Sequence, residues 1–592
     1  WEGKFFVSGA FSDRVLASLS VAGQEQGEGF GTNRVSGKDI VHEDYLSVRG
    51  RLVFKVTDNF EIELAPYYNE LDSSNAAVNG VPKGARPATA NGGLFFDLTP
   101  APPANFTTKP RDAYYNAEPI YRFEETGASL TMTYDHDNFE LVSITNYNES
   151  DALIGGDIDT TDAIGWAIAF VPGGVNGTNP TVNFAASYDY PEFLSQEIRL
   201  TSTGDGPLQW VVGAYYQDST DAYDPIGVYL TPHQPRWSHQ GDIDIAAYAQ
   251  SIVGSVTLEA LGIYAQLNYE VTDRLNLTVG ARHNDEEKDH YGEVYVNTSW
   301  PTGATPFRAI RIDNDDSWTT PTWHLSASYD FEHAMVYASY NTGFKSGAYN
   351  VSSPSAPGPV EEELVDSYEI GFKSDLLDGR LRLNGNVFYW QTDDMQFGVL
   401  SEVTGTAILQ NAAEAEAKGL ELELTYLPTE GMTLFANLGW IDSEYTSFPN
   451  YVGRPPQVDE NGNPIGGTAV TPLDVEGEPV IKSPEHTISV GMFYEHPVGD
   501  GMTLEFNLDV THKGEAYNDI EHTDTLKQDS YALANASVGL RIPRNDRVYK
   551  ITAWGRNLAD ETVLVGGSSV FNTQRARYNS PRTYGVRFSV DF

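Results

Sequence analysis

The sequence predicts an all-β fold: a transmembrane antiparallel β-barrel of the 22-strand class, with about 21 strands in this chain. Three observations support this prediction. Polar and apolar residues alternate along the whole chain, short and long connectors alternate, and the composition is rich in aromatic residues. A lipid-facing wall requires the alternation of polar and apolar residues, and the topology of a membrane barrel requires the alternation of short and long connectors. The two membrane interfaces require the aromatic residues.

Apolar and polar residues alternate with period two in many segments of about ten residues. Residues 584–592 place Tyr, Val, Phe, Val and Phe on one face, and Gly, Arg, Ser and Asp on the other. The same pattern recurs at 381–387, 420–426 and 504–510. A single strand of a soluble sandwich would look the same, but recurrence from end to end is typical of a transmembrane β-barrel.

The connectors between these segments are of two kinds. Ten are short, polar and turn-forming, at 12–13, 58–59, 137–138, 204–206, 273–274, 332–333, 378–379, 429–431, 499–501 and 545–546. Ten are long, at 24–42, 71–127, 151–190, 218–257, 284–316, 347–361, 395–411, 445–482, 515–529 and 561–580. Strict alternation indicates periplasmic turns and extracellular loops. A propeller or solenoid would instead repeat at constant spacing.

Ten turns and ten loops separate 21 strands, so the two ends of the wall fall on opposite sides of the membrane. The last strand ends at Phe592 on the periplasmic side, which places Trp1 on the extracellular side. Single-chain bacterial barrels have an even number of strands. We therefore expect residues 1–592 to form a barrel whose first strand is absent from this chain. A lumen of this size needs a plug, and we expect the N-terminal plug domain to be absent too.

Composition excludes several classes of protein. Aromatic residues make up 12% of the chain, including 34 Tyr, as interfacial girdles require. No run approaches the ~18 apolar residues of a spanning helix. The absence of Cys excludes disulfides and thiolate metal sites, and the net charge of −46 excludes nucleic acid as a partner. The excess of Asp and Glu indicates either a solvated surface or loops that attract cations. We favour the solvated surface.

Several stretches occur in a characteristic order. They are Ser36–Leu52, Asn341–Gly347 (NTGFKSG) before a Pro-rich loop, 361–373 (EEELVDSYEIGFK), 411–424 (NAAEAEAKGLELEL), 554–561 (WGRNLADE) and the terminal 582–592 (RTYGVRFSVDF). Together they resemble the barrel of the TonB-dependent receptor family. The resemblance covers essentially the whole chain. No stretch resembles the family's plug or its periplasmic TonB box.

The resemblance implies energised uptake of a scarce ligand across the bacterial outer membrane. The expected partners are outer-membrane lipid, the barrel-assembly machinery that recognises Phe592, and the inner-membrane TonB system, which would act through the missing N-terminal region. A ferric siderophore is the family's commonest cargo. An oligosaccharide or another nutrient is the alternative ligand, and an open diffusion channel is the alternative from another class.

The long loops hold the residues that we expect to bind ligand. These are Trp166 in one loop and Tyr223, Tyr229, His233, Arg236 and Trp237 in another. Aromatic rings could stack on a catecholate or sugar ring while Arg pairs with an anionic group, or the same residues could pack as a loop cap.

Residues 283–290 gather His, Asp and Glu, which suit a divalent metal but fit a solvated loop better. We expect no resident metal and no cofactor. The chain has no H-E-x-x-H, G-x-S-x-G or P-loop motif, so we predict no catalytic residues and no enzyme activity.

Overall fold

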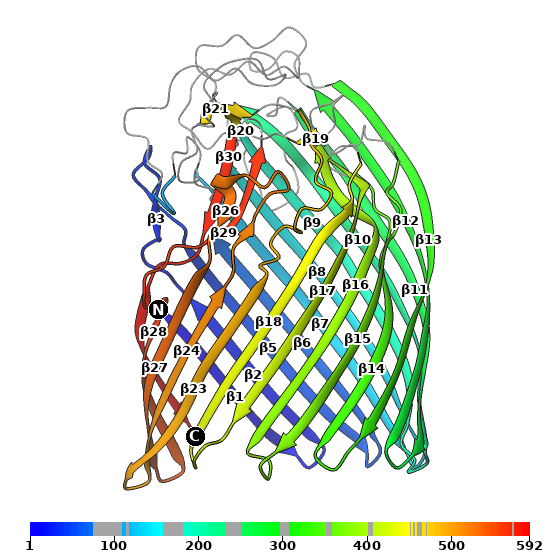
Figure 1. The fold of residues 1–592 in the computed structure, drawn as a ribbon, viewed down its shortest axis with the longest axis vertical. Helices are drawn as coiled ribbons and strands as arrows, with labels where there is room; N and C mark the ends of the chain where they lie inside the picture. Colours follow the sequence, from blue (N-terminus) through cyan, green and yellow to red (C-terminus); the bar gives the residue numbers. More distant parts are fainter. Residues whose placement is uncertain are drawn as a thin grey trace.

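The computed structural model describes most of the wall of a β-barrel and part of its loops (Figure 1). The described residues are 1–74, 109–113, 118–157, 182–230, 250–296, 307–350, 358–400, 407–449, 452–453, 456–458, 464–468, 471–570 and 573–592. Among them, no helix is long and apolar enough to cross a membrane.

One antiparallel sheet of 21 strands forms the wall. Its strands are β1 (Glu2–Ser12), β2 (Val15–Gln24), β5 (Glu43–Thr57), β6 (Phe60–Ser73), β7 (Ile120–His136), β8 (Phe139–Asp157), β9 (Val182–Ser202), β10 (Leu208–Leu230), β11 (Gln250–Thr272), β12 (Leu275–Val296), β13 (Phe307–Asp330), β14 (Ala334–Lys345), β15 (Glu363–Leu376), β16 (Leu381–Leu400), β17 (Ala407–Tyr426), β18 (Met432–Ser447), β23 (His486–Gly499), β24 (Met502–Lys513), β27 (Tyr531–Arg544), β28 (Arg547–Arg556) and β31 (Thr583–Asp591). Each strand pairs with its sequence neighbour in the wall, which confirms the predicted up-and-down topology.

The described parts of the loops contain short strands and the 3-10 helix η2. They are β3 (Gly31–Thr32), β4 (Asp39–Ile40), β19 (Val452–Gly453), β20 (Pro456–Val458), β21 (Pro464–Thr468), β22 (Thr471–Pro472), β25 (Ala516–Tyr517), η2 (Asp524–Leu526), β26 (Lys527–Gln528), β29 (Leu564–Val570) and β30 (Thr573–Tyr578). In Figure 1 the labelled elements β19, β20, β21, β26 and β30 lie at the end of the barrel opposite the short turns.

All ten predicted short turns join strands in the structure, but five of the ten predicted loops are too long. The connector expected at 284–316 is mostly strand, because β12 continues to Val296 and β13 begins at Phe307. The prediction was wrong here because it relied on apolar alternation. That alternation ends where the strands leave the bilayer, whereas backbone hydrogen bonding between strands continues above it.

The register assigns each side chain to the lipid or to the lumen. On β17, Leu422 pairs with Leu438, while the adjacent Glu421 pairs with Asn386 of β16 and accepts a hydrogen bond from its amide at 3.0 Å. Leu422 therefore lies on the outer face and Glu421 on the inner face, as predicted. At the upper edge of the outer band, Tyr340, Tyr368 and Tyr389 pair in a row across three strands. They form part of an interfacial aromatic girdle.

On the inner face, aromatic rings lie across glycines of the neighbouring strand. Tyr337 of β14 pairs with Gly371 of β15, and a Cβ at that glycine would lie 2.6 Å from the phenol ring. The hydroxyl of Tyr337 donates a hydrogen bond to Glu369. Five other inward rings lie over a paired glycine in the same way: Tyr67 on Gly127, Tyr264 on Gly213, Phe388 on Gly419, Phe435 on Gly491 and Trp554 on Gly585. These joints lock the register of adjacent strands.

Two of the motifs prove to be joints between strands and loops. The amide of Asn411 donates to the backbone oxygens of Glu361 and Asp394, and its oxygen accepts from the amide of Glu361 at 2.7 Å. Asn557 has a φ of 49° and binds the backbone of Glu561 through both ends of its side chain. These residues hold the loop bases of β15–β17 and β28 in place.

The sheet does not close on itself. Within the described chain, β1 pairs only with β2 and β31 pairs only with β28. Both strands run from the loop end to the turn end, as expected from the strand count, so they cannot pair antiparallel with each other. Side chains bridge this seam. A guanidinium nitrogen of Arg587 lies 3.7 Å from a carboxylate oxygen of Glu2. Between the loops, Arg111, which lies between β6 and β7, donates to the side-chain oxygen of Asn579, which precedes β31, at 3.0 Å.

We predict that Leu422→Arg and Phe506→Arg each destabilise the barrel by roughly 2–4 kcal/mol, the cost of a cation at mid-bilayer depth. Glu421→Arg and Asn507→Arg, one residue away and facing the lumen, are the matched controls. Urea unfolding in lipid vesicles measures the difference. Equal losses at both faces would contradict the assigned orientation.

We also predict that Gly371→Ala destabilises the barrel by about 1–3 kcal/mol, because the new methyl group would overlap the Tyr337 ring. Tyr337→Ala in the same chain should restore part of that stability. Gly439→Ala is the control, since no atom of the described residues lies within 4 Å of its Cβ position. Chemical denaturation of refolded protein would reveal the rescue. A double variant no more stable than Gly371→Ala alone would refute the joint.

Candidate functional site

The candidate site is the inward face of β10–β13 at the extracellular end of the barrel. Because side chains alternate, β12 directs Arg282, Asn284, Glu286, Lys288 and His290 to the lumen, one above another. We call this row of inward side chains on β12 the β12 track.

The upper part of the β12 track is an aromatic and cationic cluster. The Lys288 ammonium donates to the backbone oxygen of Gly347 at 2.6 Å and lies 5.5 Å from the ring centroid of Trp318. Gly347 ends the NTGFKSG motif and packs so closely on Trp318 that a Cβ would overlap the indole. The ring of Tyr349 lies 4.8 Å from that of His290. The motif therefore fixes the loop base against the barrel wall.

Two side chains of this cluster are buried without hydrogen-bond partners among the described residues. Within that part of the chain, both ring nitrogens of His290 and the hydroxyl of Tyr349 lack a partner, although the residues are only 4% and 8% exposed. Leaving such groups unsatisfied costs about 1–3 kcal/mol each. Burial, reinforced by the charges of Asp316 and Asp315, raises the pKa of Tyr349 to about 12. Its hydroxyl therefore remains a hydrogen-bond donor across the physiological pH range.

Below the cluster, Arg282 lies beside a hollow of about 470 Å³. Its guanidinium carbon is 5.6 Å from the ring of Tyr215 and 5.8 Å from that of Tyr264, and its Nε donates to Asn284 at 2.5 Å. In the described part of the chain, no carboxylate oxygen lies within 4.0 Å of Arg282. A guanidinium held between two rings is ordered before an anion binds, so little entropy is lost on binding.

A buried hydrophobic cluster lies at another part of the extracellular mouth. Ile408, Ala413, Ala415, Tyr445, Phe448, Val475 and Ile520 form one buried cluster from four segments of the chain. Asp519 lies beside it, 5% exposed, and accepts hydrogen bonds from the backbone amide and hydroxyl of Thr523. Burial, aided by the charge of Glu521, raises the pKa of Asp519 to about 7. His522, next in the loop, bonds Glu478 at 3.0 Å and so ties two loops together.

The structure describes only some of the residues predicted to bind ligand. Tyr223 lies on β10 and, by its pairing with Gly254, faces inward. Tyr229 lies in the backbone of β10, but its side chain is outside the described residues. Trp166, His233, Arg236 and Trp237 also lie outside the described residues. Their role in binding stays a prediction. Phe592 follows β31 and is 78% exposed.

Sequence reasoning missed the β12 track because it assigned residues 284–316 to a loop. A period-two count continued past Ala281 would have placed Arg282, Lys288 and His290 on one face. The same count separates the suspected metal donors, since Asp285 and Asp289 face outward while Glu286 and His290 face inward. Among the described residues no group of three or more His, Asp or Glu side chains could hold a metal ion.

An antiparallel barrel with an apolar outer band, an aromatic girdle and a polar lumen defines a transmembrane β-barrel protein. The family model "TonB dependent receptor-like, beta-barrel" matches residues 60–558. This chain therefore belongs to the TonB-dependent receptors, whose barrels are outer-membrane proteins of bacteria.

Individual relatives carry the names of pesticin and ferric-pyoverdine receptors. The chain is 26% identical over 403 residues to the pesticin receptor of Yersinia enterocolitica, covering 67% of this chain and 51% of that protein. It is 25% identical to the ferric-pyoverdine M114 receptor PbuA of a Pseudomonas strain, covering 57% and 36%. The chain thus spans about half the length, or less, of these curated relatives.

Solved structures share the fold at low sequence identity. The ferric yersiniabactin uptake receptor FyuA of Yersinia pestis matches with a TM-score of 0.73 and 19% identity, covering 100% of this chain and 78% of that one. The siderophore receptor PiuA of Acinetobacter baumannii matches with a TM-score of 0.69 and 16% identity, covering 100% and 79%.

We predict that the loop containing Asp519 loses stability as pH rises through about 7. The pKa of this carboxyl is higher in the folded loop than its ordinary 3.8, so the folded loop binds the proton more tightly. The stabilisation is complete below the ordinary pKa of 3.8 and is lost as the pH rises above the pKa of about 7 in the folded loop. Hydrogen exchange of peptides from 514–529, corrected for the intrinsic rate, should therefore show less protection at pH 8 than at pH 5.5.

Asp519→Asn should remove this pH dependence, because a neutral amide does not titrate. Asp529→Asn, at an exposed position of the same loop, is the control and should behave like the unmodified protein. Unchanged pH dependence in Asp519→Asn would show that another group titrates.

Proposed function

We propose that this protein is an outer-membrane receptor for the TonB-dependent uptake of a ferric siderophore. The observation that carries the proposal is the inward face at the mouth of the receptor barrel, where Arg282 and Lys288 of the β12 track lie beside aromatic rings. The names of similar proteins support the ligand class, since they include receptors for ferric pyoverdine and ferric yersiniabactin. The proposed protein binds and transports its ligand and catalyses no reaction.

In this proposal the ligand binds first at the loops and then at the track. Trp166, Tyr223, Tyr229, His233, Arg236 and Trp237 contact it at the loops. Trp318 offers a ring for stacking, and Tyr349 and Lys288 offer hydrogen-bond donors. Arg282 pairs with an anionic oxygen group of the ligand, because its guanidinium is already oriented and has no acidic partner in the described chain.

We further propose that the complete protein has an ascending strand and a plug domain before Trp1. One strand placed between β1 and β31 would run antiparallel to both and pair their free edges. The inner-membrane TonB system would act on that N-terminal region, and the barrel-assembly machinery would recognise Phe592. The even strand number of bacterial barrels supports this arrangement.

We predict that Arg282→Ala in the full-length protein weakens binding of an anionic ferric siderophore by about 10- to 100-fold, the value of one charge-assisted hydrogen-bonded contact. Arg541→Ala is the matched control, because Arg541 also faces the lumen but lies 3.6 Å from Glu505. Binding and uptake of radioactive iron would be measured with catecholate, hydroxamate and carboxylate siderophores. No iron uptake with any of them would favour an oligosaccharide or another nutrient.

An open diffusion channel is the alternative function, because the inner wall is polar enough to hold water. Collapse of the proton gradient separates the two. Energised uptake should stop, whereas uptake that survives in the full-length protein would identify a channel. Planar-bilayer conductance of residues 1–592 beside the full-length protein adds an independent test. A fragment that inserts but does not conduct would show that its own loops seal the lumen.

A further inference from the structure

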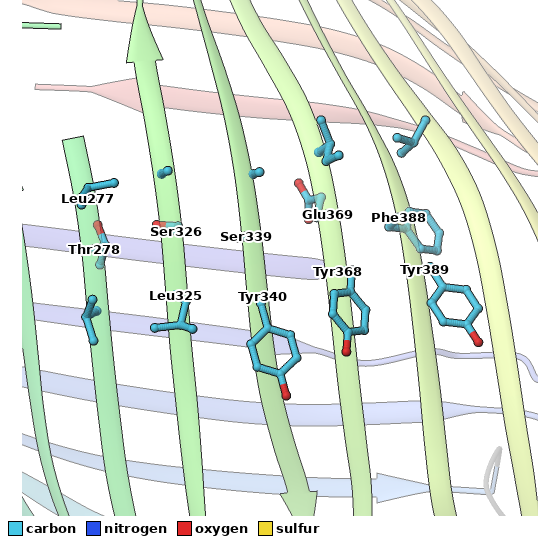
Figure 2. Close-up of a pocket in the computed structure, with 15 residues that line it drawn as sticks. Leu277, Thr278, Leu325, Ser326, Ser339, Tyr340, Tyr368, Glu369, Phe388 and Tyr389 are labelled. Atoms are coloured by element: carbon cyan, nitrogen blue, oxygen red, sulfur yellow. The ribbon is translucent and has the colours of Figure 1, made fainter. Parts of the chain in front are cut away.

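The outer wall carries an apolar depression on strands β12–β16 (Figure 2). Its volume is about 700 Å³. The floor is formed by Ala327 and Ala338, which pair across β13 and β14. The same cross-strand row continues to Leu277 on one side and Ile370 on the other. Two methyl side chains between two large ones leave a hollow in an otherwise even wall.

The polar groups of this outer surface lie at one end of the depression. Tyr340, Tyr368 and Tyr389 line its extracellular rim, and Figure 2 shows their rings side by side on one face of the strands. The ring centroids of Tyr340 and Tyr368 are 5.0 Å apart. An occupant must therefore be long and apolar, with a polar end at the height of the tyrosine hydroxyls. Those are the properties of an outer-leaflet lipid, because tyrosine girdles lie at the headgroup level.

The charges next to the rim restrict the headgroup. The Tyr340 hydroxyl donates to Asp366 at 2.6 Å, and the Tyr389 hydroxyl donates to Glu416 at 2.8 Å. Each carboxylate retains acceptor capacity after one such bond. Lys418, which pairs with Tyr389 in the sheet, is neutralised by Asp442 at 3.0 Å. The rim is thus acidic and favours a headgroup with a cationic hydrogen-bond donor.

We propose that this depression is a specific binding site for a zwitterionic aminophospholipid, with an acyl chain on Ala327 and Ala338 and its ammonium at Asp366 and Glu416. The site is on the outer wall, away from the lumen, and does not depend on which ligand the receptor transports. A second copy of the chain fits less well. It would have to project a complementary apolar ridge into the hollow and bury the acidic rim against its own rim.

Native mass spectrometry of the delipidated full-length protein tests the proposal. Phosphatidylethanolamine, phosphatidylglycerol with the same acyl chains, and lipid A are added at equal concentration. We expect about two- to fivefold more phosphatidylethanolamine adduct than phosphatidylglycerol adduct, the scale of one or two exposed charge contacts. Preference for phosphatidylglycerol or lipid A would overturn the headgroup assignment.

Variants locate the site. Ala338→Phe should fill the depression and lower the amount of phosphatidylethanolamine adduct by at least the same factor, about two- to fivefold. The matched control is Ala436→Phe, a small residue on the outer face of β18. The pair Asp366→Asn and Glu416→Gln leaves the hollow intact and should bring the two phospholipids to equal binding. This pair tests the site even if Ala338→Phe fails to fold. Undiminished binding in Ala338→Phe, or a dimer that it dissociates, would refute the lipid site.

Discussion

The structure depends on one constraint: inside a bilayer, every backbone amide and carbonyl must find its partner in another strand. That requirement makes the wall a sheet and makes each strand pair with its sequence neighbour through a short turn. It also explains why the seam between β1 and β31 is the weakest place in the described chain. Among the described residues, the edge groups there lack backbone partners, and only side-chain contacts such as Arg587 with Glu2 cross the gap.

The inner face solves a second problem, since a wide polar lumen has no apolar core to hold the strands in register. Rings such as Tyr337 lie across glycines of the next strand, and the hydroxyls of the three tyrosines among them bond to carboxylates. Each such pair interlocks two strands sideways, in a direction that backbone hydrogen bonds leave flexible. The barrel is therefore stiffened from inside by repeated local contacts, while the lipid face needs only to be apolar.

The family motifs and the candidate ligand groups have different roles. Asn411 and Asn557 bind backbone atoms of adjacent segments and act as structural joints. Gly347 lies between these roles, because it packs on Trp318 and accepts the Lys288 hydrogen bond at the mouth. Motifs recognisable in a sequence thus mark the places where loops attach to the wall. In the proposed function, the chemistry that meets a ligand is carried by residues such as Arg282, which belong to no motif.

The sequence alone determined the fold class, the ten turns, the strand directions and the inward and outward faces of the segments 381–387, 420–426, 504–510 and 584–592. It could do so because lipid and water impose a period-two pattern that can be read one residue at a time. Only the tertiary structure decided how far the strands rise above the bilayer, since polar residues on both faces leave no such pattern. It alone also brought Lys288, Trp318 and Tyr349 together, and Ala327 beside Ala338. Such neighbours are set by the pairing of separate strands, which depends on their register.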